Sequence, residues 1–279
     1  MTSVTLIKEG LALVNSGPLH MTVQVSERGA PLSELAKSGA IFALEVLKQQ
    51  ADWLSVVKER VLELSMGEAY PGVVNKMIIA SLSMNDPNLT PLAAVAGAAS
   101  DMVADYVAGI GATKIIVNNG GDIAIRLTEG DSATVGVRLN LMRPDYDYVV
   151  LIDGDCGICT SGIGGRSFTL GVADGVAVLA RQAAVADAAA TFLGNKTVVN
   201  SPEVKRILAE SIYPDTDLLG VEVTHSVGAL SENEIETAIN TGKAEALMLM
   251  ERNLILGAVI SVKDHVDLVG YFVKALKKV

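Results

Sequence analysis

The sequence predicts an α+β protein in which mainly antiparallel sheets pack against helices. Strand-like runs follow one another directly and helical segments come in separate blocks, whereas a doubly wound parallel sheet alternates the two. Hydrophobic residues make up 50% of the 279 residues and aromatic residues only 4%. Ala, Val, Leu, Ile and Met must therefore fill the core, which suits close packing of helices on sheets. A chain of this length can form one compact domain, and we expect residues 1–279 to do so.

The first third of the chain predicts strands and then helices. Residues 4–26 alternate apolar and polar side chains in short runs separated by glycine-containing turns, which predicts two or three strands. In residues 31–64 the apolar positions recur at helical spacing, which predicts one long helix or two in succession. A shorter helix over 73–82 should end before the breaker Asn85-Asp86-Pro87.

Residues 91–111 predict another helix, with Pro91 in its first turn. Small residues form a stripe along this helix and would let it pack very close to a neighbour, although a ligand against the same face is the alternative. The stripe consists of Ala94, Gly97 and Ala98.

Four strands are expected in the middle of the chain. Residues 114–117 form a buried run, and the Asn- and Gly-rich segment 118–122 predicts a hairpin turn into a strand over 122–127. Strands over 132–139 and 148–153 follow, so an antiparallel meander is expected.

The last third predicts a mixture of short elements. Ser201-Pro202-Glu203 has the order typical of a helix start, and a strand is expected over 221–228. A helix should run from about Ser231 to Glu251, followed by strands over 254–262 and 265–270.

Neither the cysteines nor the histidines predict a particular chemistry. Cys156 and Cys159 form a C-x-x-C pair that is too small for a four-cysteine zinc site, and we expect two small residues in a tight loop, with a redox dithiol as the alternative. The three histidines fall in predicted strands and are expected to be partly buried structural residues: His20, His225 and His265.

The charge balance restricts the kinds of partner. The net charge is -10, and a surface this negative repels nucleic acid and anionic membranes. The apolar run Leu254–Val262 is far shorter than the roughly 20 residues of a membrane-spanning helix, and the first residues have no pattern of a secretory signal. We therefore expect a cytoplasmic protein with a small-molecule partner. The sequence leaves the formation of a homodimer open.

The stretch from Asp153 to Asn195 carries the main functional prediction. A loop of small residues with hydroxyls and glycines, Thr160–Ser167, precedes an apolar strand and an alanine-rich helix that carries Asp187 and Thr191. Those two are four positions apart, so they share one face of the helix and offer two oxygen ligands to a hard cation such as Mg²⁺. The glycines let backbone N–H groups approach a phosphate. We therefore hypothesise a magnesium-assisted nucleotide or pyrophosphate site.

Three blocks of sequence resemble the ApbE family, the flavin transferases that move FMN from FAD onto a Ser or Thr of a target protein. They are AGAASD at 96–101, NNGGDI at 118–123, and TSG at 160–162 followed by ADAAAT at 186–191. The resemblance covers roughly residues 90 to 195 and looks closer still to a shorter, functionally uncharacterised branch of the superfamily.

The resemblance implies an ApbE-like fold, bound Mg²⁺ and a flavin, FAD or FMN. It implies that Asp187 and Thr191 are magnesium ligands. It also implies that two segments lie near the flavin or its phosphates, and these consist of Asn119, Gly120, Gly121 and Asp122 in the turn and Thr160, Ser161 and Gly162 in the loop.

The chain departs from the flavin-transferase pattern at the positions expected to do acid–base chemistry. The family has a Lys where this chain has Ala96, and a His-x-x-Asp-Pro segment where this chain reads RSFTLGVADG from Arg166. Asp174 survives as a candidate catalytic carboxylate. Arg166 is a candidate for stabilising phosphate charge, although a solvated surface arginine is an equal alternative.

Three functions stay open from the sequence. The first is a magnesium-dependent transferase or hydrolase that acts on a dinucleotide such as FAD. The second is a non-catalytic flavin- or nucleotide-binding protein that kept the site and lost the chemistry. The third is a repurposed fold that acts on an unrelated small acid, with Arg166 binding the carboxylate.

Overall fold

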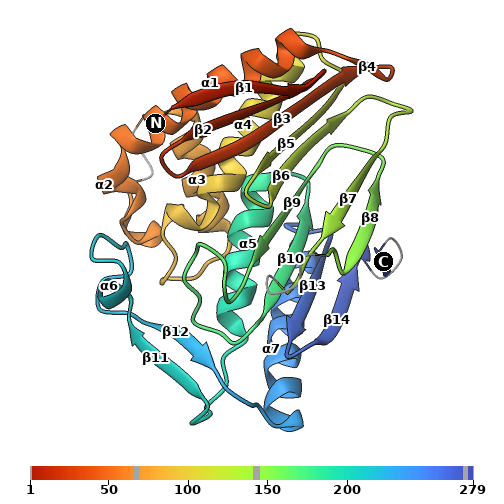
Figure 1. Ribbon diagram of the computed structural model, residues 1–279. Helices are drawn as coiled ribbons and strands as arrows, with labels where there is room; N and C mark the ends of the chain where they lie inside the picture. Colours follow the sequence, from red (N-terminus) through yellow and green to blue (C-terminus); the bar gives the residue numbers. More distant parts are fainter. Residues whose placement is uncertain (1, 66–68, 141–144, 273–275, 279) are drawn as a thin grey trace. The chain divides into compact units, whose positions relative to one another are not determined.

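The computed structural model in Figure 1 describes residues 2–65, 69–140, 145–272 and 276–278. It confirms the α+β class. The chain forms two compact units, each assembled from segments that are distant in the sequence. Unit 1 comprises Met1–Ala133, Ile152–Cys159 and Ala180–Asp187, and unit 2 comprises Thr134–Leu151, Thr160–Leu179 and Ala188–Val279. A single domain over residues 1–279 stays a prediction.

Unit 1 contains an antiparallel sheet with the strand order β1-β2-β3-β5-β6-β9, and β4 pairs with β3. Two or three strands are predicted for residues 4–26, and the structure has three. The strands are β1 (Ser3–Lys8), β2 (Leu11–Ser16), β3 (Leu19–Glu27), β4 (Ala30–Pro31), β5 (Lys114–Asn119), β6 (Asp122–Leu127) and β9 (Cys156–Ser161).

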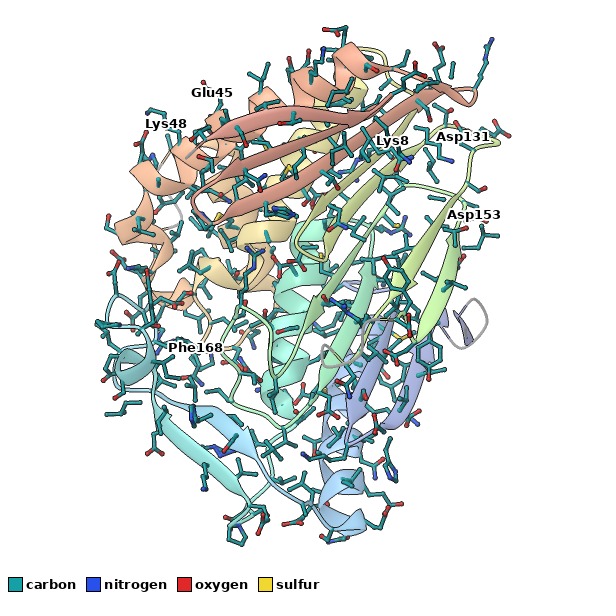
Figure 2. The ribbon with its side chains drawn as sticks, in the orientation of Figure 1. Lys8, Glu45, Lys48, Asp131, Asp153 and Phe168 are labelled. Atoms are coloured by element: carbon teal, nitrogen blue, oxygen red, sulfur yellow. The ribbon has the colours of Figure 1, made fainter. Side chains whose placement is uncertain are left out.

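The helices of unit 1 cover one face of this sheet. Helix α1 packs on β2 and β3, and α4 packs on β5 and β6, as Figure 1 shows. Glu45 and Lys48 project from α1 into solvent (Figure 2). The helical segments are α1 (Ser33–Asp52), α2 (Leu54–Val57), α3 (Gly72–Ser83) and α4 (Val95–Gly109), with 3-10 turns at Val61–Glu63 and Pro91–Ala94. The helix predicted from Pro91 thus starts as a 3-10 turn.

The hairpin turn between β5 and β6 forms where the sequence predicts it. Gly120 and Gly121 have φ angles of 70° and 113°, a backbone conformation that a side chain makes costly. The Gly121 N–H donates to Oδ1 of Asn118 at 2.9 Å, which closes the turn.

Unit 2 contains three small groups of strands. Their orders are β10-β13-β14, β11-β12 and β15-β8-β7, and helix α7 packs on β13 and β14. The elements are β7 (Ala133–Val137), β8 (Tyr148–Ile152), β10 (Gly175–Ala180), β11 (Val204–Leu208), α6 (Ala209–Ile212), β12 (Glu222–Val227), α7 (Glu232–Glu251), β13 (Gly257–Val262), β14 (His265–Gly270) and β15 (Leu276–Lys278). Helix α5 (Ala183–Lys196) begins in unit 1 and ends in unit 2.

The predicted meander of four consecutive strands is wrong. Strand β6 pairs with β9, and β7 pairs instead with β8 in a separate sheet. The physical reason lies in burial, because the first four residues of β9 are all buried whereas β7 alternates buried and more exposed positions. A strand buried on both faces suits the interior of a sheet, and an alternating strand suits a sheet with one solvated face.

Four smaller expectations are also corrected. Cys156 and Cys159 lie in β9 rather than in a loop, and Thr160 and Ser161 end that same strand, so the loop begins at Gly162. Ser201-Pro202-Glu203 forms a turn before β11, in which the Glu203 N–H donates to the Ser201 hydroxyl, rather than a helix. The histidines do lie in strands, but all three are exposed: His20, His225 and His265.

No helix in the described part of the chain is both long enough and apolar enough to cross a membrane.

Candidate functional site

Helices α4 and α5 each supply a carboxylate to the first turn of the other. Oδ2 of Asp187 on α5 accepts hydrogen bonds from the Gly97 N–H at 2.8 Å and the Ala96 N–H at 3.2 Å on α4. In return, Oδ2 of Asp101 on α4 accepts from the Ala184 N–H on α5 at 2.9 Å. The first N–H groups of a helix have no partner within the helix, so these two contacts act as reciprocal caps.

The reciprocal caps depend on very close approach of the two helices. A Cβ at Gly97 would lie 2.2 Å from the Ala183 carbonyl oxygen and 2.8 Å from Cβ of Asp187. A Cβ at Gly157 of β9 would lie 2.2 Å from Cα of Ala183. Gly97, in the small-residue stripe predicted along 91–111, therefore serves close helix packing, which is the first of the two interpretations given for the stripe.

Arg126 of β6 holds the second oxygen of Asp101. Its Nη2 lies 2.9 Å from Oδ1 of Asp101 and 2.7 Å from Oδ1 of Asp105. Burial alone would lower the pKa of Arg126, but the charges of and hydrogen bonds to Asp101 and Asp105 outweigh burial and raise it. Asp101 is thus a fully buried carboxylate with hydrogen bonds to both oxygens.

Cys159 lies beside the capped helix ends. Its Sγ donates to the Ala183 carbonyl oxygen at 3.2 Å. Burial raises the pKa of Cys159 well above its usual value, and the charges of Asp122, Asp187 and Asp101 raise it further. Burial also raises the pKa of Cys156 to about 12. Since a redox dithiol needs an accessible thiolate, this pair does not fit that role.

The turn that contains Asn119 and Asp122 presents buried oxygen atoms. Asn119 is only 5% exposed, and its Oδ1 has no hydrogen-bond partner within the described residues. Asp122 is 9% exposed, and its backbone carbonyl accepts from the Ser100 hydroxyl at 2.8 Å. An unpaired buried acceptor costs about 1–3 kcal/mol, so the Asn119 amide suits a ligand that brings a hydrogen-bond donor.

In unit 2, the loop after β9 passes directly beside Asp174. The Ile163 N–H donates to the Ala173 carbonyl at 3.0 Å, and a Cβ at Gly162, whose φ is 141°, would lie 2.6 Å from the Asp174 carbonyl oxygen. Only glycine fits this approach. The structure therefore places the Thr160–Gly162 segment beside the backbone of Asp174, whereas the Asp174 carboxylate faces the Lys263–Asp264 turn.

The Ser161 hydroxyl also lies near the second half of α5. A Cβ at Gly194 would lie 3.9 Å from Oγ of Ser161. Thr191 is half-buried. It precedes Gly194 by three positions, so Thr191 and Gly194 lie on the same side of α5. Ser161 thus lies beside the part of α5 that contains Gly194, three positions after Thr191.

The two predicted catalytic residues differ in their surroundings. Asp174 is half-buried, and its carboxylate accepts from the backbone N–H groups of Lys263 and Asp264. Burial raises the pKa of Asp174 above its usual value, although those N–H groups and the Lys263 charge act in the opposite direction. Arg166 is exposed on the loop.

Sequence reasoning missed Asp101 and Arg126. The Asp of AGAASD was visible in the sequence, but its partner Ala184 lies 83 positions away and no local pattern connects them. No group of three or more His, Cys, Asp or Glu side chains in the described ranges could hold a metal ion. Asp187 and Thr191, one turn apart on α5, thus form at most part of a coordination shell.

The arrangement of sheets and helices is the fold of ApbE proteins. The structure aligns over 98% of this chain with the apo flavinyl transferase ApbE of Pseudomonas stutzeri, covering 100% of that chain with a TM-score of 0.56 and 16% sequence identity. The ApbE protein of Thermotoga maritima aligns over 98% of both chains with a TM-score of 0.53 and 12% identity. These two likenesses define the class of protein, an ApbE-like α+β fold.

The family is defined more closely by sequence. The family model described as "AbpE bacteria" matches residues 5–268, and the chain belongs to this family within the ApbE-like superfamily. A "UPF0280 protein" of Methanococcus vannielii is 34% identical over 176 residues, which are 59% of this chain and 68% of that protein. A "UPF0280 protein" of Methanosarcina acetivorans is 35% identical over 142 residues, and the match spans about half of each chain, 50% of this one and 54% of the relative.

Proposed function

We propose that this protein binds a flavin nucleotide, with FAD as the expected form, together with Mg²⁺, and transfers or hydrolyses at the pyrophosphate. The observation that carries the proposal is the fold, which this chain shares over 98% of its length with the flavinyl transferase ApbE of Pseudomonas stutzeri. The segments that resemble that family in sequence are those that hold the buried polar groups of the candidate site.

Asp187 and Thr191 are suited to hold Mg²⁺ jointly with phosphate. Magnesium usually takes one or two carboxylates from a protein and completes its shell with water and phosphate oxygens. The two N–H groups on Oδ2 of Asp187 fix the orientation of its carboxylate. When bound, the ion would neutralise charge on the phosphoryl oxygens. We therefore expect Mg²⁺ to bind weakly alone and more tightly with the nucleotide.

Each unit, taken by itself, has polar groups that suit a part of a nucleotide ligand. Oδ1 of Asn119 is an acceptor, so it suits the N–H edge of a flavin or adenine ring and not a phosphate, which offers only acceptors. The hydroxyls of Thr160 and Ser161 can donate to phosphate oxygens, with the backbone at Gly162 beside them. Arg166 and Asp174 are the proposed charge-stabilising and acid–base groups.

A second candidate function is flavin or nucleotide binding without turnover. It is favoured by Ala96, which stands where flavin transferases carry a Lys, and by the lack of a His-x-x-Asp-Pro segment between Thr160 and Asp187. The Asp174 carboxylate also accepts two backbone N–H groups, which leaves it less available as a base.

Incubation with FAD and MgCl₂, followed by chromatography for FMN and AMP, tests the proposal. The expected result is magnesium-dependent release of AMP by the unaltered chain. Asp187→Asn should weaken magnesium-dependent FAD binding at least roughly tenfold, as loss of a metal-site partner does. The matched control is Asp153→Asn, because Asp153 is an exposed aspartate (Figure 2) and its replacement should change nothing.

A ligand panel read by melting temperature separates the alternatives. FAD that raises the melting temperature without any turnover would support the second candidate. If FAD, FMN, ADP and pyrophosphate all leave the melting temperature unchanged, both candidates are contradicted, and an unrelated small acid is favoured as the ligand.

A further inference from the structure

We propose that Asp101 is a positioning residue for the magnesium site: by capping α5 it fixes where the first turn of that helix places Asp187. This inference deepens the proposed function and rests on it for the role of Asp187 as a metal ligand. Asp101 itself would contact neither the ion nor the nucleotide.

The contact between Asp101 and α5 occurs in the same helical turn that carries Asp187. Oδ2 of Asp101 accepts from the Ala184 N–H at 2.9 Å, and Asp187 follows Ala184 by three positions. Residues three apart in a helix lie on the same side of it. Any rotation or fraying of the first turn of α5 would therefore move the Asp187 carboxylate.

The two caps and the two helical turns form a closed ring. On α4, Gly97 and Asp101 are four positions apart and share a face, and on α5, Ala184 and Asp187 share a face. The chain of contacts runs from Gly97 to Asp187, along α5 to Ala184, and through Asp101 back to α4. The first turn of α5 is attached to α4 through these two contacts. Loss of the Asp101 contact would therefore leave that turn, and the Asp187 carboxylate that it carries, less firmly positioned.

Arg126 explains how the interior accommodates the Asp101 carboxylate. Asp101 is 0% exposed, and a buried carboxylate without a partner is strongly disfavoured. The guanidinium of Arg126 pairs with Oδ1 at 2.9 Å, which leaves Oδ2 directed at the Ala184 N–H. Arg126 also pairs with Asp105, which is not a cap of α5 and is therefore a matched control.

The test compares Asp101→Ala, Asp101→Asn and Asp105→Asn in the full-length chain. FAD binding is titrated at several Mg²⁺ concentrations to obtain the apparent affinity for Mg²⁺ in the presence of FAD. We expect Asp101→Ala to weaken this affinity at least about tenfold while FAD binding without Mg²⁺ stays within about twofold. Asp101→Asn has one acceptor oxygen for two donors, Arg126 and the Ala184 N–H, so it should recover only part of the loss. Asp105→Asn should match the unaltered chain.

A purely structural role would give a different result. In that case Asp101→Ala would lower the free energy of unfolding, but the folded variant would bind FAD with the same dependence on Mg²⁺ as the unaltered chain. That result would overturn the proposal. If the alanine variant fails to fold, Asp101→Ser takes its place, because its shorter side chain keeps polarity but does not reach Ala184.

Hydrogen exchange separates this inference from the proposed function. In the ligand-free chain, Asp101→Ala should speed amide exchange at residues 184–187 relative to the rest of α5, and Asp105→Asn should not. If the unaltered chain binds FAD without regard to Mg²⁺, the proposed function fails, and the exchange rates still decide whether Asp101 positions the first turn of α5. Unchanged exchange at 184–187 would overturn the positioning role.

Discussion

The thiols of Cys156 and Cys159 show how far burial can change the chemistry of a residue. Both are buried, and three positions apart in a strand they point to opposite faces of it, so they cannot act as a local pair. The rise of the Cys156 pKa from 9.0 to about 12 lowers its thiolate fraction at pH 8 by about a thousandfold.

We therefore expect both thiols to be inert in the folded protein. At pH 8, a colorimetric thiol reagent should react with neither cysteine in native buffer and with both in 6 M guanidinium, because the thiolate is the reactive form. Rapid reaction of either native thiol at the rate of free cysteine would contradict the burial described here.

The two capping carboxylates illustrate what a single sequence can predict at this scale. Asp187 was predicted as a metal ligand from its spacing to Thr191 and its surrounding motif, because both are local, and that role stays a prediction. Its hydrogen bonds to Ala96 and Gly97 were not predicted, because they connect positions 91 and 90 apart. The unpaired Oδ1 of Asn119 could not be predicted either. An asparagine in a turn has the same sequence pattern whether or not its side-chain amide has a hydrogen-bond partner.

Among the secondary-structure elements, the β13–β14 hairpin has a strained turn. Its two central residues, Lys263 and Asp264, have φ angles of 48° and 65°, and neither is glycine. A two-residue turn with both φ angles positive favours Asn followed by Gly. The Asp174 carboxylate accepts from both backbone N–H groups and so helps to hold the turn.

Replacing the turn by Asn-Gly should stabilise the protein. We expect the double change Lys263→Asn and Asp264→Gly to raise the free energy of unfolding by about 1 kcal/mol, measured by urea denaturation, because it relieves backbone strain. Loss of the hydrogen bond from Lys263 Nζ to the Val227 carbonyl will reduce the gain. The single change Asp264→Gly leaves that bond in place and serves as the control, and a decrease in stability for both variants would contradict the strain.

Periodicity predicted the long elements better than their partners. Helices α1, α3 and α7, the β5–β6 hairpin and the strands β13 and β14 were predicted because each is specified by local spacing, caps or turn residues. Helix α7 even has the full capping box of Ser231 and Glu234. The partner of β6 was predicted wrongly because pairing is decided by burial across the sheet, which no local pattern records. The helix predicted to start at Ser201-Pro202 is absent because a serine before a proline also suits a turn.

For the whole molecule, the free energy of unfolding should depend on pH through Asp174. Burial raises the pKa of this carboxyl in the folded chain above its usual value of 3.8. The stability contributed by the protonated form is therefore complete below about pH 3.8 and is lost as the pH rises through the folded pKa.

Asp174→Asn removes this titration. The variant should gain stability relative to the unaltered chain between about pH 4 and pH 7, measured by urea unfolding at four or five pH values. The lost acceptor for Lys263 and Asp264 adds a constant offset, so the slope of the difference is what matters. A difference that moves in the opposite direction would mean that the folded chain favours the ionised form.

The α+β class and the ApbE-like family could be predicted from the sequence because composition, block order and short motifs all persist at that level. The division of the chain into two units could not, since segments such as Ile152–Cys159 and Ala180–Asp187 join unit 1 from far along the chain. Residues 153–195 looked like one continuous functional stretch, whereas in the folded chain they are shared between both units.

The reciprocal caps also bear on the order in which the chain can mature during synthesis. A growing polypeptide that has passed α4 but has not reached residue 183 carries exposed amide hydrogens at Ala96 and Gly97, since the acceptor arrives 90 residues after Gly97. A chain cut between β9 and α5 would have the same defect. Helix α4 therefore reaches its final stability only after most of the molecule has left the ribosome.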